Sequence, residues 1–389
     1  MSETPLLSPL TLRGVTLRNR LVVSPMCMYA SENGFASDWH LGHLSSFAFG
    51  GHSVVFTEAT AVEVEGRISH GDLGIWSDDH IPGLKRAADL VNSLGAIAGI
   101  QLAHAGRKAS TQRPWEGFGP LTDNDALKGQ APWPVVGPSA TPAGPEYPTP
   151  NELDAAGLEG VREAFAHAAR RAAKAGFRAI DIHGGHGYLL QSFLSPIANS
   201  RTDAYGGTLE NRMRFPLEVA KAVRENFPDE YPVFYRISSV DGVDGGWEIE
   251  DSIEFAVQLK LIGIDIVDCS SGGVTTLAPA VRKDATRAIP RGLGFQVGYA
   301  DTIRRDAGIR TMAVGLIVDP EQANQIVASG QADLIAVGRE ALFDPAFANH
   351  CAHRLGADDE KFAFTTGNYK WWLERRERNL VKLRAAASA

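Results

Sequence analysis

The segment RAAKAGFRAIDIH, residues 171–183, contains the end of one helix and the strand that follows it. Alanine and basic residues favour a helix at its start, and Gly176 stands where helices end in the left-handed conformation. Ala179–His183 is a short apolar run of the kind that forms buried strands. The same change from helix through glycine to strand recurs at Gly95, Gly263, Gly308 and Gly330. The chain is therefore predicted to repeat one helix–strand unit.

Eight short apolar runs fit this pattern and are predicted strands. They are Arg20–Val23, Ser53–Thr57, Ala96–Leu102, Ala179–His183, Val233–Ile237, Asp265–Cys269, Thr311–Val314 and Leu334–Val337. Each is continuously apolar, as strands buried on both faces are. Helical patterns between them include Leu84–Leu94, Leu158–Ala175, Leu217–Asn226, Ile253–Leu261 and Pro320–Ala328. Eight such units predict an α/β fold, a (β/α)8 TIM barrel, with an open doubly wound sheet as the alternative.

Three further segments are assigned within one predicted domain, residues 1–389. Leu6–Asn19 reads as a hairpin turning at Arg13-Gly14, which would cap the bottom of the barrel. The insertion Ala105–Pro150 follows the third strand, and a loop of this length is typical of a lid. Residues 366–389 form a C-terminal tail.

Composition narrows the class of protein. The 389 residues carry a net charge of −8, 44% hydrophobic and 22% charged residues, with no basic stripe, so we expect no nucleic-acid partner. No apolar run approaches the roughly 20 residues of a membrane span, and Met1–Pro9 has no signal pattern, so we expect a cytoplasmic protein. Cys27, Cys269 and Cys351 are scattered, which disfavours disulfides, zinc ribbons and iron–sulfur clusters.

Glycines and an arginine follow the last two predicted strands at their carboxyl ends, where the chemistry of such barrels takes place. Gly315 follows the seventh run, and Gly338-Arg339 follows the eighth. Backbone N–H groups and a guanidinium suit a phosphate dianion, so these residues are candidate phosphate ligands. The alternative is that the glycines only end their strands and Arg339 pairs with a surface carboxylate.

His183 and His186 follow the fourth run, with Tyr188 close behind. We interpret the histidines as donors to a substrate oxygen and the tyrosine as a proton donor, as general acid chemistry requires. Histidines with purely structural hydrogen bonds are one alternative, and a metal site is another, although the spacing is not the helical HExxH pattern. A third metal ligand would have to come from Asp181, Glu58 or Asp268.

Arg236 and Cys27 lie at two other strand ends. A guanidinium at the end of a buried strand needs an anion, which is either a bound group with delocalised charge or a structural carboxylate. Cys27 has no nucleophile signature around it, and simple packing is the alternative to a place in the site.

Longer motifs carry a resemblance to a known family. The main block runs from His183-Gly-Gly-His186-Gly-Tyr188 to Pro196, through Asn199–Gly207, to Glu210–Phe215. Supporting blocks are Leu17–Arg20, Ser24–Tyr29, Gly66–Ile68, Gly74–Asp78 and Gln101–Lys108. From about Leu7 to Arg376 the chain resembles the Old Yellow Enzyme family, FMN-dependent ene reductases on a (β/α)8 barrel. It is most similar to the bacterial, cysteine-containing branch that includes xenobiotic reductases.

The resemblance implies roles for individual residues. Flavin contacts are assigned to Ser24, Pro25, Met26, Cys27, Ala59, Gln101, Arg236, Gly315, Gly338 and Arg339, with Arg236 at the N1/O2 edge and the last three at the phosphate. Substrate binding is assigned to Tyr29, His183 and His186, and proton donation to Tyr188. Arg291 stands where some relatives carry an aromatic residue. Trp372 or Arg375 would enter a neighbouring subunit's site, or else the tail is a helix packed on its own barrel.

The resemblance also implies an activity. It is NADPH dehydrogenase and ene reductase activity on α,β-unsaturated carbonyl, nitro or quinone compounds, by ping-pong transfer through FMN. NADPH is the expected donor, NADH is possible, and a homodimer or homotetramer is expected.

Three alternatives stay open. FMN barrels acting on dienoyl-CoA or trimethylamine-type substrates carry extra domains and an iron–sulfur cluster, for which this chain has neither the length nor the cysteines. A metal-dependent hydrolase using His183 and His186 is the second alternative, and a flavin-binding protein without turnover is the third.

Overall fold

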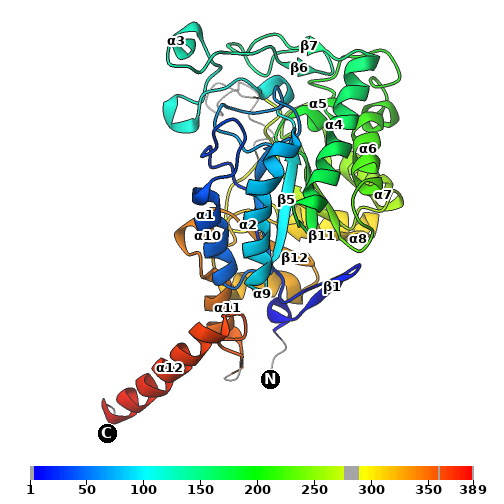
Figure 1. The fold of residues 1–389 in the computed structure, drawn as a ribbon. Helices are drawn as coiled ribbons and strands as arrows, with labels where there is room; N and C mark the ends of the chain where they lie inside the picture. The colour runs from blue at the N-terminus through cyan, green and yellow to red at the C-terminus, as the bar shows by residue number, and fades with distance from the viewer. Residues whose placement is uncertain (1–3, 276–288, 358–359, 388–389) are drawn as a thin grey trace.

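A computed structural model describes residues 4–275, 289–357 and 360–387, and its centre is a closed barrel of eight parallel strands (Figure 1). The strands are β3 (Leu21–Val23), β4 (Val54–Ala61), β5 (Ile97–Ala103), β8 (Ala179–Gly184), β9 (Val233–Ser238), β10 (Ile266–Ser270), β11 (Arg310–Ala313) and β12 (Leu334–Val337). They pair in chain order, and β12 returns to β3 to close the ring. The barrel prediction is confirmed, and the open sheet is wrong.

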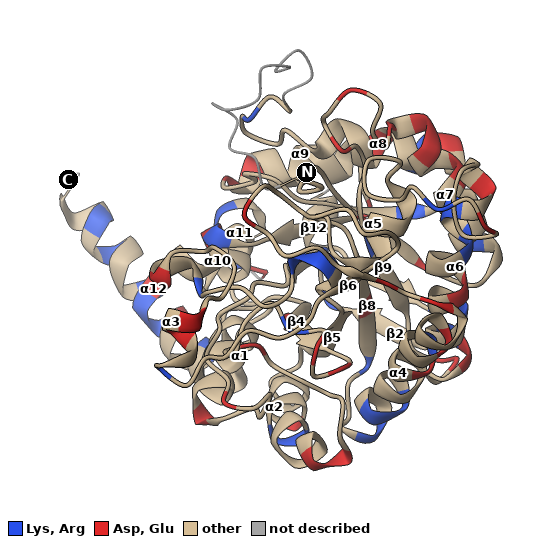
Figure 2. Cartoon of the chain, turned by 90° about the horizontal axis from the view of Figure 1, so that it is seen from above, with Lys and Arg blue, Asp and Glu red and all other residues tan. Residues whose placement is uncertain are grey.

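Helices surround the barrel as an outer layer, seen from above in Figure 2. The longer ones are α1 (Asp38–Phe49), α2 (Ile81–Ser93), α4 (Ala155–Lys174), α6 (Leu209–Glu225), α7 (Ile249–Leu261), α8 (Val297–Ala307), α9 (Pro320–Ala328) and α11 (Phe347–Leu355). Every residue of β4, β5, β8 and β9 is buried between this layer and the barrel interior. This burial explains why the strands read as unbroken apolar runs.

Helix α6 begins earlier than predicted. The helical pattern expected from the sequence began at Leu217, whereas the helix begins at Leu209. In the structure Thr208 caps the helix, with its side chain accepting from the Asn211 N–H, and Pro216 lies inside it. Burial of Phe215 and Pro216 against the core outweighs the local cost of the proline.

The N-terminal hairpin closes one end of the barrel, as predicted. Strand β1 (Leu10–Leu12) pairs with β2 (Val15–Leu17), and Arg13 adopts a φ of 53° at the turn. Leu12, Val15 and Leu17 join an interior apolar cluster with residues near the starts of the barrel strands, among them Val22, Val54 and Leu334. The Arg13 Nε lies 2.7 Å from an Asp265 carboxylate oxygen, which fixes the hairpin to the barrel.

The insertion after β5 lies over the opposite end, at the top of Figure 1. It contains the short elements η3 (Gly106–Lys108), η4 (Pro114–Glu116), α3 (Asp123–Ala126) and β6 (Val136–Gly137), which pairs with β7 (Asn151–Glu152). The Trp133 indole donates to the Glu65 carbonyl at 3.0 Å. The insertion therefore covers the carboxyl ends of the strands, and its motion as a lid stays a prediction.

Helix α12 (Gly367–Ala387) points away from the barrel (Figure 1). None of its described residues is buried, and Trp372 is 65% exposed. Its first three turns contact the body, where Tyr369 stacks on Phe49 with ring centroids 5.7 Å apart and a Glu377 carboxylate oxygen lies 3.5 Å from the His353 Nε2. The tail helix thus packs on its own barrel only over these turns, and the rest of it extends away from the body. Entry into a neighbouring site stays a prediction.

Across the described ranges, no helix has both the length and the apolarity to cross a membrane.

Glycines end the helices in the left-handed conformation, as the recurring pattern predicts. The φ angles are 79° at Gly95, 87° at Gly176, 90° at Gly263, 63° at Gly308 and 73° at Gly330. A side chain is strained in this region, at a cost of about 1–2 kcal/mol.

We predict that Gly176→Ala lowers the thermal midpoint of unfolding, because it forces a side chain into the left-handed region at a cost of about 1 kcal/mol. Gly160 is the matched control, since it lies inside the same helix and a Cβ there would meet nothing within 4 Å. Gly160→Ala should raise the midpoint, because alanine is the better helix former by about 1 kcal/mol. Shifts of the same sign in the two variants would contradict this account.

Candidate active site

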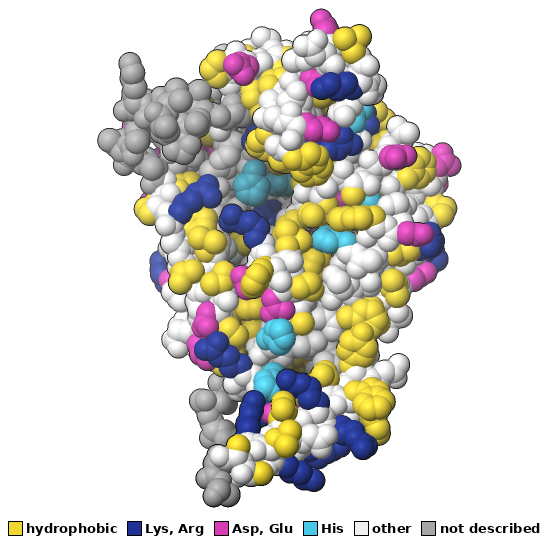
Figure 3. All heavy atoms as spheres, turned by 90° about the vertical axis from the view of Figure 1, so that its left-hand side faces the viewer, with side chains coloured by type: hydrophobic (Ala, Val, Ile, Leu, Met, Phe, Trp, Pro, Cys, Tyr) yellow, Lys and Arg dark blue, Asp and Glu magenta, His cyan; other side chains and the backbone are white. Residues whose placement is uncertain are grey.

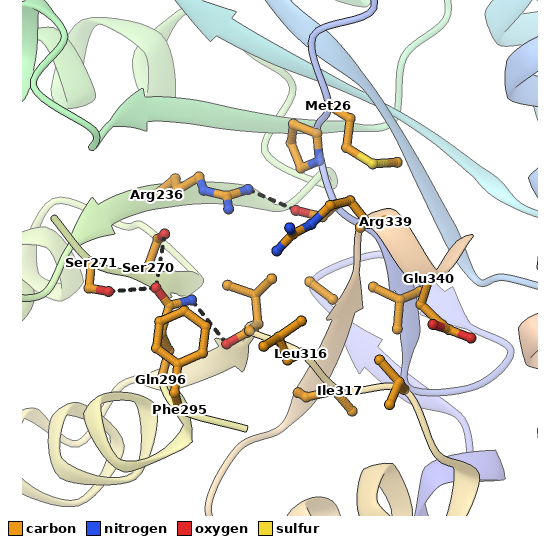
Figure 4. A pocket seen from close by; sticks show the side chains of 18 of the residues that line it. Met26, Arg236, Ser270, Ser271, Phe295, Gln296, Leu316, Ile317, Arg339 and Glu340 are labelled. Carbon is orange, nitrogen blue, oxygen red and sulfur yellow. Dashed lines mark hydrogen bonds between the residues drawn. The ribbon is translucent and has the colours of Figure 1, made fainter. Parts of the chain in front are cut away.

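A cavity of about 530 Å³ opens at the carboxyl ends of the barrel strands (Figure 4). Many of the predicted site residues line it: Ser24, Pro25, Met26, His186, Arg236, Gly315, Gly338 and Arg339. In Figure 3 a hollow with histidine and basic side chains opens beneath the upper loops. Predicted site residues from five strand ends therefore lie around one cavity.

Arg236 is held at the wall of this cavity by two contacts. Its Nη1 donates to the Ser24 Oγ at 2.9 Å and lies 3.2 Å from an Asp268 carboxylate oxygen. Asp268 is fully buried, and the Nε of Arg236 is buried without a hydrogen-bond partner among the described residues. From the sequence, a structural carboxylate and a bound group were alternative partners of Arg236. In the structure, Arg236 both pairs with a carboxylate and lines the cavity.

Asp181 adds a second buried acid near this ion pair. It has no exposed surface, and its carboxylate accepts from the Gln101 amide at 2.7 Å. Burial, and then the negative charge of Asp268, hold the pKa of Asp181 well above its usual range, against the opposing effect of Arg236. Asp181 therefore holds its proton to a higher pH than an ordinary aspartic acid does. Gln101, predicted as a flavin contact, bonds this acid and is not among the residues that line the cavity.

The phosphate corner predicted at the last two strands forms one wall of the cavity. Gly315 has a φ of 122°, and a Cβ there would lie 3.0 Å from the Gln296 amide and the Phe295 ring. Gly338 precedes the short helix α10 (Arg339–Phe343), and Arg339 points into the cavity in Figure 4. Backbone and guanidinium donors thus face the same space.

Several lining residues were not predicted. Gln296 accepts from the Ser271 hydroxyl at 2.6 Å and donates to the Val314 carbonyl at 3.1 Å, which joins the ends of β10 and β11 (Figure 4). Phe295 lies beside it, and the Arg291 guanidinium lies 5.7 Å from the Phe295 ring centroid. Nothing in the sequence around Gln296 and Phe295 indicates a place in the site. Ser270 and Ser271, in contrast, directly follow a predicted strand and could have been identified from that position.

His183 is a neutral hydrogen-bond donor. The Gly185 N–H donates to its Nδ1 at 3.3 Å, so the ring proton is on Nε2. Burial lowers the pKa of His183 well below its usual value, and the positive charges of Arg236 and Lys108 lower it further. An Nε2–H donor is therefore fixed at this strand end.

His186 is more constrained than the sequence indicates. It has a φ of 59°, in the left-handed region, and its N–H donates to the Ser238 hydroxyl at 2.9 Å. Its Nε2 lies 2.7 Å from the Ser270 hydroxyl. The His183 and His186 rings meet edge to face, with centroids 5.2 Å apart. A substrate oxygen would therefore compete with Ser270 for His186.

Tyr188 lies beside His183, with ring centroids 5.0 Å apart. Both residues line a smaller recess next to the cavity, together with Ala59 and Asp72. Burial holds the pKa of the Tyr188 phenol well above its usual value, so the phenol keeps its proton. Burial also raises the pKa of Asp72 to about 7, and no sequence argument had identified this residue.

Tyr29 and Cys27 belong to an apolar cluster that also includes Tyr188. Tyr29 has a φ of 55°, and its ring meets that of Trp115 at 5.9 Å. Cys27 is half-buried, and burial raises the pKa of its thiol well above the usual value. Neither residue is among those that line the cavity or the recess, and the contact of Cys27 with the flavin stays a prediction.

The acids that a metal site would need are engaged elsewhere. A Glu58 carboxylate oxygen accepts from the Met28 and Tyr29 N–H groups, and Asp268 pairs with Arg236. Among the described residues, no three His, Cys, Asp or Glu side chains are grouped so as to hold a metal ion. The geometry gives no support to a metal-dependent hydrolase.

Comparisons with known proteins agree in family and fold. Residues 5–358 match the model of the NADH:flavin oxidoreductase / NADH oxidase family. The chain is 44% identical over 356 residues to the NADPH dehydrogenase of Geobacillus sp. (strain WCH70), covering 91% of this chain and 95% of the relative. It is 45% identical to the NADPH dehydrogenase of Listeria monocytogenes serotype 4a (strain HCC23), covering 90% and 95%. Among solved structures, morphinone reductase matches with a TM-score of 0.71 at 25% identity, over 94% of this chain and 95% of that chain.

We predict that Asp181→Asn raises the thermal midpoint at pH 7. The pKa of Asp181 is raised on folding, so ionisation of this acid opposes folding above the ordinary carboxyl pKa of about 4. Asparagine has nearly the shape of the protonated acid and cannot ionise. The increase in the thermal midpoint over the wild type should therefore be largest at neutral pH. The advantage should vanish as the pH falls to about 4, where the acid is protonated in both states.

Asp265→Asn is the control, because Asp265 is a carboxylate in an ion pair with Arg13 at the barrel's other end. This variant should lower the midpoint at pH 7. A lower midpoint for Asp181→Asn at pH 7 would mean that Asp181 is a stabilising anion and would contradict the assignment.

Proposed function

Since the chain belongs to the NADH:flavin oxidoreductase / NADH oxidase family, the Old Yellow Enzyme family that its motifs indicate, we propose that it reduces the activated C=C bonds of α,β-unsaturated carbonyl compounds, with nitro compounds and quinones as further oxidants. The observation that carries this proposal is the neutral Nε2–H donor of His183 next to the protonated phenol of Tyr188, beside the large cavity. One group can polarise an oxygen while the other protonates a nearby carbon.

The cavity fits an FMN cofactor. Its volume of about 530 Å³ lies within the range of cofactor pockets, roughly 300–1,000 Å³. Gly315 admits no side chain without contact at 3.0 Å to Gln296, so the wall at the phosphate end stays open to a ligand. The Arg236 guanidinium lines the cavity and supports an electron-rich group there.

On this proposal Arg339, Gly315 and Gly338 bind the phosphate, and Arg236 and Ser24 bind the polar edge of the ring system. Pro25, Met26, Cys27, Ala59 and Gln101 complete the proposed cofactor contacts. The chemistry that FMN supplies when bound is hydride transfer from a nicotinamide to the electron-poor carbon of the substrate.

The chain's own residues then account for activation of the substrate. His183 donates from Nε2 to the carbonyl or nitro oxygen, and His186 joins it when that oxygen replaces the Ser270 hydroxyl. Tyr188 delivers the proton to the α-carbon, and Tyr29 borders the substrate from the neighbouring cluster. NADPH is the proposed donor, in line with the names of the relatives from Geobacillus and Listeria, and NADH is the alternative.

We predict that the purified protein is yellow with one FMN per chain, that NADPH bleaches the flavin without air, and that 2-cyclohexenone restores the colour. Stopped-flow absorbance measures both half-reactions. A colourless protein with bound zinc would contradict the proposal in favour of a hydrolase. A yellow protein that NADPH bleaches and no enone, nitro compound or quinone reoxidises would contradict it in favour of flavin binding without turnover.

We further predict that His183→Ala lowers kcat/KM for 2-cyclohexenone by about 10²–10³, the usual cost of one donor to a developing oxyanion. The His183→Ala, His186→Ala double variant should retain no more activity than the single variant. FMN content, read from absorbance, shows whether the pocket survives.

His350→Ala is the control for removing an imidazole. His350 pairs with Asp344 at 2.6 Å and is largely exposed, away from the cavity-lining residues. This variant should keep wild-type turnover. Unchanged enone turnover in the double variant would overturn the donor assignment.

A further inference from the structure

Lys108 lies at the end of η3, where the insertion leaves the barrel, and its ammonium is surrounded by carbonyl groups. Its Nζ donates to the His186 carbonyl at 2.8 Å and to the Gly273 carbonyl at 3.1 Å. Within the described ranges, the ion pairs found do not include Lys108. Taking even a partly buried ammonium out of water for carbonyl partners alone is costly, so the position of Lys108 needs a physical explanation.

The two carbonyls come from loops that are pressed together. A Cβ on Gly273 would lie 2.6 Å from the His186 Cα, and a Cβ on Gly187 would lie 2.2 Å from the Gly273 carbonyl oxygen. The Ser238 hydroxyl, which receives the His186 N–H, donates to the Gly272 carbonyl at 2.7 Å. Two carbonyl dipoles therefore point at one spot, and the Lys108 ammonium neutralises both.

Lys108 also contacts the proton-donor candidate. Its Nζ lies 5.1 Å from the centroid of the Tyr188 ring, within the range of a cation–π interaction. His186 is held at a φ of 59°, a conformation that costs about 1–2 kcal/mol without support. One side chain thus fixes the strained backbone of one candidate catalytic group and the ring of another.

We propose that Lys108 is a positioning residue for the substrate site: by joining the His186 and Gly273 carbonyls and covering the Tyr188 ring, it holds the oxygen-binding and proton-donating groups in their working geometry. This inference rests on the function proposed above. Lys108 acts through His186 and Tyr188 and takes no part in bond making.

The charge of Lys108 has a second effect. After burial and Arg236, it lowers the pKa of both His183 and His186, which keeps the two rings neutral. Burial, and then Arg107, lower the pKa of Lys108 itself to about 8. The charged and titratable groups that face it in the described chain are Arg107, His183, His186 and Tyr188. Loss of its proton above pH 8 therefore removes the charge that binds the two carbonyls.

Arg107 provides a matched control on the same turn. It is 1% exposed and donates to the Thr141 and Pro142 carbonyls at 3.2 and 3.0 Å, and to the Val274 carbonyl. It ties the insertion to the loop after β10 by the same kind of bond, without contact to His186 or Tyr188. Arg107→Met therefore reports the structural cost of losing a buried cation that binds carbonyls.

The test measures kcat/KM for 2-cyclohexenone from about pH 6 to pH 10 in the wild-type holoenzyme and in Lys108→Met, Lys108→Arg and Arg107→Met. For the wild type we expect a fall above pH 8. Lys108→Met should lower the neutral-pH value by about 10²-fold, as misplaced catalytic groups do, and should lack the fall at pH 8. Lys108→Arg should recover much of the rate and move the fall to higher pH, because a guanidinium keeps its proton. Arg107→Met should keep the neutral-pH rate and still show a fall, moved to higher pH because one of the two causes that lower the Lys108 pKa is removed.

Two outcomes would overturn the proposal. One is a Lys108→Met enzyme with wild-type kcat/KM and pH profile. The other is a Lys108→Arg enzyme whose rate still falls at pH 8, which remains decisive if Lys108→Met fails to fold.

A wild-type enzyme that reduces no activated alkene would contradict the proposed function instead. In that case a crystal structure of the Lys108→Met holoprotein decides the positioning role without turnover. A His186 backbone and a Tyr188 ring in their wild-type positions would overturn it, and displacement of either would support it.

Discussion

The barrel strands are buried on both faces, against the interior and against the surrounding helices. A strand between the interior and the helical layer has no solvated side, so polar groups collect where strands end. The exception is the interior group of Arg236, Asp268 and Asp181, one cation with two acids. Such a group is tolerated because the raised pKa of Asp181 favours its neutral form and Asp268 is paired with Arg236. The same ion pair holds the Arg236 guanidinium at the cavity wall.

The two histidines of the motif are not equivalent in the structure. His183 lines the recess with Tyr188 and has its Nδ1 occupied by a backbone N–H, whereas His186 lines the large cavity and bonds the Ser270 hydroxyl. His183 is therefore ready to donate to a ligand, whereas the neighbouring His186 must first release the Ser270 hydroxyl. Turnover and ligand affinity can consequently be altered separately, through Ser270 on one side and the neighbours of Tyr188 on the other.

The barrel and much of the cavity wall could be predicted from the sequence, because both depend on residue patterns within short segments. Gly176 marks a helix end by its own conformational freedom, and Gly338-Arg339 follows a strand directly. Gln296 could not be predicted, because its place depends on how the loop before α8 folds back onto β10 and β11. The start of α6 was misplaced for a similar reason, since burial outweighed the local preference of Pro216. The engagement of His186 by Ser270 required the register of two strands that are separate in the chain.

The charge of helix α12 affects how the protein would adsorb to a charged solid support. It carries six basic and two acidic residues, while the whole chain has a net charge of −8. The positive charge therefore projects from the end of the molecule opposite the insertion that covers the site (Figures 1 and 2). An anionic support would therefore adsorb the molecule by this helix. Adsorbed in this orientation, the enzyme would present the mouth of its cavity to the solution.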